Sequence, residues 1–473
     1  MVFSSLIFLF GFLIVYLAVY FFAPEKYRNQ VLLAASLVFY AWSGPQFLLV
    51  LIGESLISWF CALRVARSEG VRGKRVWLVA DIVALLGLLA YFKYAVWIMG
   101  NFQFVFGVPE LIPTIVLPIG ISFYTFQLIT YVADVYWGKV KAQPAFWKVL
   151  LYASMFFQCI AGPIVRYDTI ANEIDNRRIT SADVFLGMRR FCIGLAKKAV
   201  LANSCAEVAD TLLPIGTDAL WSEPTAALWL GMLFYMLQIY FDFSAYSDMA
   251  IGMGQMVGFH FLENFNYPYV CKSVQDFWRR WHISLSTFFR DYVYIPLGGS
   301  RCSTIKIVRN MAVVWFLTGL WHGASWNYIF WGLYFLVFLL FERFVIKDRL
   351  PAALGHVYAL VVVYFGWVLF KFENFAELGH VLAGMFGFGG VALGSLEVQT
   401  IFLQNVFLLA FCIVACTNAG QLLHKWLFRM SKRGGAWFVL FNATELVTPI
   451  ALLLLSVVVL TGASYNPFIY FQF

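Results

Sequence analysis

The chain has 473 residues, of which 62% are hydrophobic and 12% are charged, and its formal net charge is +8. Soluble domains carry roughly 25% charged residues, so this composition excludes an ordinary soluble domain and indicates that lipid surrounds the protein. In a soluble protein the positive charge would suggest a nucleic-acid partner. Here the basic residues gather in short loops between apolar runs, where membrane topology explains them. We therefore expect contact with membrane lipid and no nucleic-acid partner.

The first apolar run, residues 2–23, contains no Lys, Arg, Asp or Glu. It is long enough for the ~20 residues that a spanning helix needs. It has no basic segment in front, and no small-residue cleavage site stands out before Pro24. We interpret it as a retained helix rather than a cleaved signal peptide.

Apolar runs of helical length recur along the whole chain, and no repeat, low-complexity run or linker divides it. The sequence therefore predicts a single domain over residues 1–473. Its fold is expected to be an all-α polytopic membrane protein of roughly 11–13 tilted or re-entrant helices. The expected spans are residues 3–22, 30–44, 46–63, 76–98, 114–137, 148–165, 184–213, 226–255, 309–321, 324–342, 352–370, 400–424 and 436–461.

The charges between these spans predict their orientation. Residues 64–75, 139–148 and 425–433 are rich in Lys and Arg, which is typical of cytoplasmic loops. Residues 100–113 and 372–400 contain neither Lys nor Arg and are expected outside. Counting helices from these loops puts both termini on the outer side of the membrane.

In the middle of the chain, Asp242 and Asp248 interrupt an otherwise apolar stretch. A carboxylate at membrane depth is costly and usually faces a cavity or a partner. Asp242 and Tyr246 are four residues apart and share one helix face, so they are candidates for the wall of a polar tunnel. The alternative is a hydrogen bond that packs helices, which we favour slightly for Asp248.

The basic segment at residues 272–310 contains seven Lys and Arg residues but only two Asp, which again indicates the cytoplasmic side. Within it, residues 275–289 have helical periodicity, with Trp278 and His282 on one stripe and Arg279 and Arg280 on another side. Such a helix would lie in the membrane interface with its basic edge toward phosphates. Simple docking on anionic lipid explains the arginines equally well. His282, on the apolar face, needs a polar partner.

A further histidine, His322, separates two uncharged runs. A turn at residues 322–325 would set it deep in the protein, with Gly323 leaving space beside the ring. It is either a core histidine satisfied by a hydroxyl or carbonyl group, or a functional one. A buried neutral imidazole can take a proton from a hydroxyl group that attacks a carbonyl carbon.

Other chemistries lack their motifs. The chain has no G-x-S-x-G elbow to supply a serine nucleophile and no H-E-x-x-H pair to hold a metal, and its eight cysteines are scattered without a CxxC pair. We therefore expect no metal site and no disulfide framework. A buried histidine beside a basic cytoplasmic segment favours direct acyl transfer from an activated, anionic donor.

These stretches resemble the membrane-bound O-acyltransferase (MBOAT) family, and within it the bacterial branch that includes the alginate O-acetyltransferase membrane subunit. The resemblance runs over nearly the whole chain. It is most specific in FWRRWHISLSTFFRDYVYIPLGG (residues 277–299) and GLWHGASWNYIFWG (residues 319–332). By this resemblance His322 matches the catalytic histidine of the family, and His282 matches the second polar position of the central motif.

The resemblance also implies a fold and an activity. The fold would be a ring of tilted helices around a central tunnel that joins a cytosolic donor side to an outer acceptor side. The activity would be that of an O-acyltransferase, with acetyl-CoA as donor substrate and no permanently bound cofactor. Periplasmic acetyltransferase proteins at the bacterial inner membrane would be its partners, and alginate or cellulose its polymer. The candidates for donor binding or the tunnel are Arg279, Arg280, Trp278, Asp242, Tyr246, Trp321 and Asn327.

Two other functions stay open from the sequence. One is transfer of another acyl group, such as D-alanine from a carrier protein to teichoic acid, since the seven cations of the basic segment fit an acidic carrier as well as coenzyme A. The other is a non-enzymatic transporter in which Asp242, His282 and His322 form a relay. The chain has no two corresponding broken halves, which weighs against the transporter.

Overall fold

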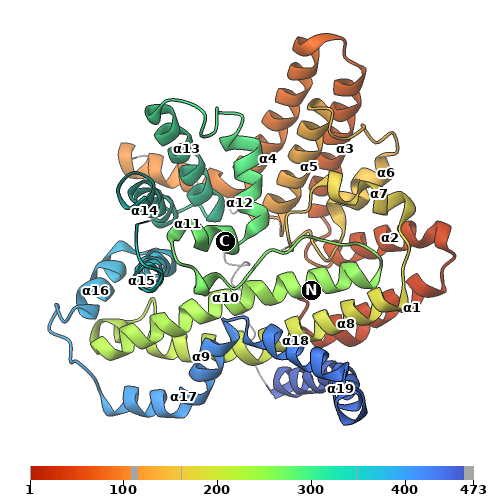
Figure 1. Ribbon diagram of the computed structural model, residues 1–473. Coiled ribbons are helices and arrows are strands. Elements are labelled where there is room, and N and C mark those ends of the chain that lie inside the picture. The colour runs from red at the N-terminus through yellow and green to blue at the C-terminus, as the bar shows by residue number, and fades with distance from the viewer. Residues whose placement is uncertain (1, 108–114, 161, 348, 463–473) are drawn as a thin grey trace. The chain divides into compact units, whose positions relative to one another are not determined.

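The computed structural model describes residues 2–107, 115–160, 162–347 and 349–462 (Figure 1). Every regular element in these residues is a helix and none is a strand, which confirms the all-α prediction. The predicted outer loop at residues 100–113 lies partly outside the described residues. The two ends of the chain also lie outside them, and their orientation stays a prediction.

Seven helices of the described residues are long and apolar enough to cross a membrane, which makes the chain a multi-pass membrane protein. The N-terminal apolar run forms a shorter helix, Ile7–Phe22. The predicted span at residues 184–213 is helical without a break over residues 181–212, with a π-helical segment, Lys197–Ala202, in its middle. The seven candidate spans are α3 (Phe47–Arg67), α4 (Gly70–Phe106), α10 (Thr225–Met256), α14 with its π-helical extension η7 (Trp326–Ile346), α15 (Ala352–Lys371), α17 (Leu396–Ala415) and α19 (Gly435–Gly462).

The Cα positions group the chain into two compact units. Unit 1 comprises Met1–Phe191 and Ser247–Glu263, and unit 2 comprises Cys192–Tyr246 and Asn264–Phe473. All of the predicted site residues belong to unit 2. The expectation of a single domain over residues 1–473 stays a prediction.

Unit 1 is organised around α3, α4 and α5 (Ile121–Tyr136), which pack against one another in pairs (Figure 1). Residues Ile121 to Val135 of α5 are all buried, including polar side chains such as Gln127 and Asp134. Just before it, Gly120 has φ +76°, and a Cβ there would lie 2.2 Å from the carbonyl oxygen of Cys159, so only glycine fits. The other helices of this unit are η1 (Ile7–Leu13), α1 (Ile14–Phe22), η2 (Glu25–Tyr27), α2 (Arg28–Ala41), α6 (Phe146–Ser154), α7 (Tyr167–Asn176) and most of α8 (Ser181–Ala196).

Unit 2 has a core rich in buried aromatic side chains, among them Trp281, Trp315, Trp331 and Trp367. Such large rings fill the space between helices with few polar atoms. Besides the spans given above, its helical elements are η3 (Lys197–Ala202), α9 (Asn203–Leu212), η4 (Asp218–Ser222), η5 (Pro268–Val270), α11 (Val274–Arg280), α12 (Ile283–Phe289), η6 (Arg290–Tyr294), α13 (Thr304–His322), α16 (Phe375–Met385) and α18 (Ala419–Ser431).

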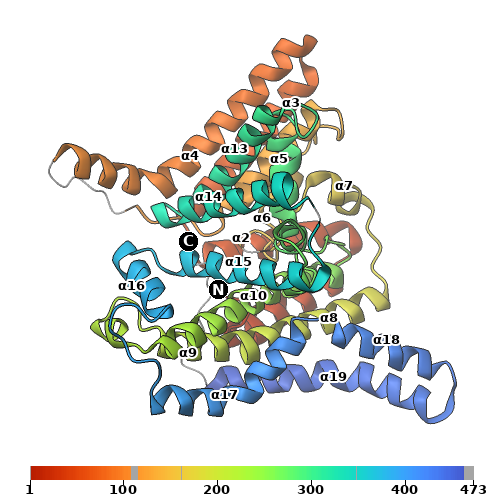
Figure 2. The same ribbon diagram turned by 60° about the vertical axis from the view of Figure 1, so that its left-hand side comes forward.

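Two glycines set the close packing of α13 against α14, which lie side by side in both views (Figures 1 and 2). A Cβ at Gly319 would lie 2.4 Å from the carbonyl oxygen of Tyr328, and one at Gly332 would lie 2.3 Å from that of Trp315. Small residues let the backbones of membrane helices approach closely. This contact fixes the end of α13, where His322 is the last helical residue.

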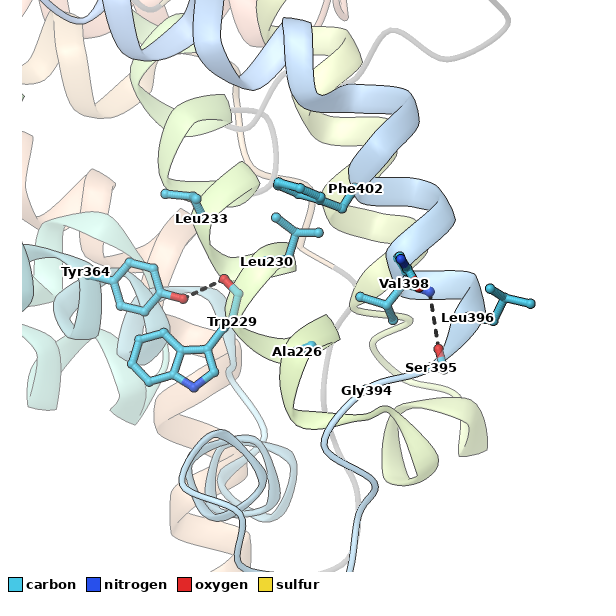
Figure 3. A pocket seen from close by; sticks show the side chains of 11 residues that line it. Ala226, Trp229, Leu230, Leu233, Tyr364, Gly394, Ser395, Leu396, Val398 and Phe402 are labelled. Carbon is cyan, nitrogen blue, oxygen red and sulfur yellow. Dashed lines mark hydrogen bonds between the residues drawn. The ribbon is translucent and has the colours of Figure 1, made fainter.

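A large apolar pocket of about 920 Å³ lies among α10, α15 and α17 (Figure 3). Two hydrogen bonds brace its wall: the Tyr364 hydroxyl donates to the carbonyl oxygen of Trp229 at 2.7 Å, and the Val398 N–H donates to Ser395 Oγ at 3.2 Å. None of the predicted site residues lines it. The two histidines lie outside this pocket.

Candidate active site

His322 lies in a box of aromatic rings. It ends α13 and is only 6% exposed. Its ring centroid lies 4.8 Å from those of both Trp321 and Trp331, and 5.1 Å from that of Phe370. The ring of Tyr328 is 6.5 Å away. The predicted turn after His322 is confirmed, because α14 begins at Trp326, and water is largely excluded from the imidazole.

The space that Gly323 leaves is filled. A Cβ at this position would lie 2.3 Å from the ring of Tyr328. The backbone of Gly323 is extended (φ −174°), so the glycine is needed here for its small size rather than for a special conformation. The ring it admits closes one side of the box around His322.

His282 is also buried, at 1% exposure, but its backbone conformation differs from that of His322. The single helix predicted over residues 275–289 is wrong: α11 ends at Arg280, α12 begins at Ile283, and His282 between them has left-handed torsions (φ 44°, ψ 56°). Such torsions cannot continue an α-helix. Burial lowers the pKa of His282 to about 3, so the ring is neutral at neutral pH.

One indole joins the surroundings of the two histidines. The ring centroid of Trp321 lies 5.6 Å from that of His282 and 4.8 Å from that of His322. The two histidines are 40 positions apart in the sequence, so the fold of unit 2 brings them to one cluster. The arrangement can move a proton to or from a reactant in a water-poor place.

Asn327 and Trp278 contact residues that surround His322 rather than His322 itself. The Asn327 amide donates to the carbonyl oxygen of Phe370 at 3.4 Å, so it acts on the end of α15, whose Phe370 ring borders His322. Trp278 packs 5.6 Å from Trp331 and 4.9 Å from Trp315. Both residues therefore reach the His322 box through an intermediate ring.

The two arginines of the central motif have different surroundings. Arg280 donates from Nε to Asp276 at 2.8 Å and from a terminal nitrogen to the Asn266 carbonyl oxygen at 3.3 Å. Arg279 is exposed and makes no hydrogen bond or ion pair with the residues that the structure describes. Of these two cations, that of Arg279 is the more accessible to an anionic ligand.

Asp242 belongs to a buried ion pair. Its Oδ1 lies 2.8 Å from Nζ of Lys198, and the two side chains are 2% and 1% exposed. Lys198 lies in the π-helical segment η3, and Tyr246 is buried one turn further along α10. The sequence reasoning did not name Lys198. The sequence does indicate a special role for Lys198, because Lys197 and Lys198 interrupt a predicted membrane span.

The fold and this site define a multi-pass helical membrane protein with a water-poor histidine centre, the class that includes integral-membrane acyltransferases. The family model described as "MBOAT, membrane-bound O-acyltransferase family" matches residues 139–377, which include both histidines. The chain belongs to the membrane-bound O-acyltransferase family and is an O-acyltransferase.

Three relatives carry more specific names. The "probable alginate O-acetylase AlgI" of Azotobacter vinelandii is 39% identical, with 100% of each chain covered. The protein of the same name from Pseudomonas aeruginosa is 38% identical, again over 100% of each chain. The peptidoglycan O-acetyltransferase of Helicobacter pylori is 34% identical over 86% of this chain and 84% of its own. The chain is thus similar over its full length to proteins named for polymer O-acetylation.

Proposed function

We propose that this enzyme takes acetyl groups from cytosolic acetyl-CoA and passes them across the inner membrane for O-acetylation of an exopolysaccharide, with periplasmic acetyltransferase proteins as partners. The observation that carries the proposal is His322, buried in an aromatic box and linked to His282 by the shared contact with Trp321. Full-length similarity to proteins named as alginate O-acetylases supports acetyl as the group and alginate as the polymer. Cellulose is the other polymer that the resemblance allows.

In the proposed reaction His322 is the general base. Its neutral imidazole takes the proton of the acceptor hydroxyl while the hydroxyl oxygen bonds to the thioester carbonyl carbon. The C–S bond then breaks, the acetyl group stays on the acceptor oxygen, and the coenzyme A thiolate leaves and is protonated. The rings around His322 exclude water that would otherwise hydrolyse the thioester.

The donor side of the proposal rests on charge. Acetyl-CoA carries phosphates, and the segment at residues 272–310 has an excess of five cations, seven against two carboxylates. Arg279 is exposed in this segment. A polar pocket of about 420 Å³ borders this segment at Lys272 and is also lined by Arg343, Lys347 and the carboxylate of Glu342. The cations suit phosphate recognition. Acetyl-CoA is a substrate here, and no resident cofactor is proposed.

The test uses inner-membrane vesicles containing the full chain, radiolabelled acetyl-CoA and the polymer with its partner proteins. We expect polymer labelling by the wild type and a loss of about 100-fold or more in His322→Ala. His424→Ala, on α18 and bonded to Glu445 at 2.9 Å, is the matched control and should retain activity.

Each alternative gives a different result in the same vesicles. If the polymer is labelled from a D-alanyl carrier protein and not from acetyl-CoA, the transferred group is D-alanine and not acetyl. Accumulation of unreacted label without acetyl release would indicate a transporter. Full polymer labelling by His322→Ala would remove His322 from the mechanism.

A further inference from the structure

The left-handed turn at His282 is held by a residue 18 positions earlier, Asn264, which is completely buried. The Asn264 carbonyl oxygen accepts the N–H of Ile283 at 2.9 Å. Its side-chain Oδ1 accepts the N–H of Ser284 at 3.2 Å and the Ser284 hydroxyl at 2.9 Å. Thus Asn264 satisfies the first two backbone donors of α12, which His282, the residue before this helix, does not cap with its own side chain.

The same oxygen meets the histidine ring. His282 Nδ1 lies 3.1 Å from Asn264 Oδ1. The neighbouring Ser284 backbone N–H can only donate, so the Asn264 atom facing it is the amide oxygen and not the amide nitrogen. An amide oxygen can only accept. Nδ1 of His282 therefore carries the hydrogen, and in the neutral ring the lone pair is on Nε2.

Three aromatic rings pack against the imidazole. Phe243 of α10 lies 4.7 Å away, Phe265 of the preceding loop 6.5 Å and Trp321 of α13 5.6 Å. None of these side chains is acidic or basic, and neither is that of Ser284. Burial alone accounts for the low pKa of His282 among the described residues. Ser284 Oγ also lies 3.4 Å from Nδ1, but its hydroxyl donates to Asn264 Oδ1 at 2.9 Å. The amide oxygen of Asn264 therefore selects the Nδ1–H form of the neutral ring.

We propose that Asn264 is a positioning residue that holds His282 in the left-handed turn as the Nδ1–H form, so that Nε2 carries the lone pair that takes part in the acyl-transfer reaction. This inference rests on the proposed function for its catalytic consequence, but not for the form of the ring. Asn264 does not touch the reacting atoms; it acts through His282.

The ring form is tested directly by nitrogen NMR of the full chain in nanodiscs, with ¹⁵N-labelled histidine. The chain has six histidines, and the His282 signals are those lost in His282→Gln. We expect a protonated Nδ1 and an unprotonated Nε2. A protonated Nε2 with an unprotonated Nδ1 would overturn the proposal. The measurement needs no activity, so it stands even if the acetyl-transfer function fails.

Substitutions test the consequence. Asn264→Asp keeps the accepting oxygen and adds a negative charge beside Nδ1–H, which should raise the pKa of His282 by roughly one to three units. At pH 8 we expect kcat within about tenfold of wild type, with a steeper loss on acidification, whereas Asn264→Ala should lose about 100-fold. Asn266→Asp adds the same charge at an exposed position two residues on and is the control.

Two results would contradict the positioning role. One is an Asn264→Ala variant that inserts normally and turns over at the wild-type rate. The other is a His282 titration in Asn264→Asp that superimposes on the titration in Asn266→Asp. If the alanine variant does not insert, the NMR experiment on the unsubstituted chain still decides the ring form.

Discussion

Lys198 Nζ lies 2.8 Å from Asp242 Oδ1, and almost no part of either side chain is exposed. The lysine comes from a π-helical segment and the carboxylate from the middle of a candidate membrane span. Two opposite charges at this depth neutralise each other, so either one alone would be a costly buried ion. This ion pair gives Asp242 a structural role, which is separate from the predicted role in the wall of a polar tunnel.

Breaking this pair should be far more harmful than removing it. We expect Lys198→Met to destabilise the protein by about 3–5 kcal/mol, because the buried carboxylate of Asp242 loses the cation that lies 2.8 Å from it. The double variant Lys198→Met with Asp242→Leu should recover most of the loss. Unfolding in detergent measures both. Arg28→Met, which breaks a pair with the exposed Glu25, is the control and should cost at most about 1 kcal/mol. Equal effects at Lys198 and Arg28 would refute the argument.

The close approach of α13 and α14 predicts a severe effect from one added methyl group. Gly319→Ala would place Cβ 2.4 Å from the carbonyl oxygen of Tyr328, so the helices must separate. We expect about 1–3 kcal/mol of destabilisation and lower activity, because His322 follows within one turn. Gly87→Ala, in the membrane helix α4 with nothing within 4 Å, should be neutral or slightly stabilising. Thermal inactivation half-lives of the two variants provide the comparison, and matching values would contradict it.

The two arginines of the central motif should separate into a ligand-binding and a structural role. Arg279→Ala should raise KM for acetyl-CoA by about tenfold at low salt, and less at high salt, because its exposed charge is screened. Arg280→Ala should mainly lower stability, because its guanidinium bonds Asp276 and the Asn266 carbonyl oxygen. Steady-state kinetics at two salt concentrations check both. An unchanged KM in Arg279→Ala would remove Arg279 from donor binding.

His260 predicts a pH-dependent link between α7 and α8. Its Nδ1 lies 2.9 Å from Glu173 and its Nε2 3.4 Å from Asp183. Burial lowers the pKa of His260, but its bonds to these carboxylates outweigh burial and raise the pKa above the ordinary 6.5. The stabilisation is therefore fully present below about pH 6.5 and is lost as the pH rises through the folded-state pKa.

The measurement is thermal stability at pH 6 and pH 8. His260→Gln should lose more stability at pH 6 than at pH 8. In a background of Glu173→Gln and Asp183→Asn, which lacks both carboxylates, His260→Gln should show no such difference. A greater loss at pH 8 in His260→Gln would reverse the assigned sign.

Local sequence patterns correctly predicted those features that depend on neighbouring residues, such as membrane segments and turns. The scarcity of charge identified a membrane protein, because lipid leaves few places for ions. The turn after His322 was predictable from an uncharged run broken by His322 and Gly323, and α13 does end there. The roles of His282 and His322 came from the resemblance rather than from the pattern, and they stay predictions.

Long-range contacts explain what the sequence did not reveal. The periodicity of residues 275–289 favoured one helix, but hydrogen bonds that Asn264 accepts from Ile283 and Ser284 stabilise a break that no local pattern records. Lys198 and Asp242 are 44 positions apart, and a pairing at that separation depends on how η3 meets α10. The contact of Trp321 with both histidines also depends on tertiary packing.

The left-handed backbone at His282 restricts which amino acids can replace it. Asn, Asp and Gly accept such torsions readily, whereas β-branched or bulky side chains do not. His282→Asn therefore removes the imidazole and preserves the backbone conformation. His282→Val also changes the backbone, so its loss of activity could not be assigned to the missing imidazole alone. The backbone torsions thus restrict this position to a few amino acids, independently of any requirement for catalysis.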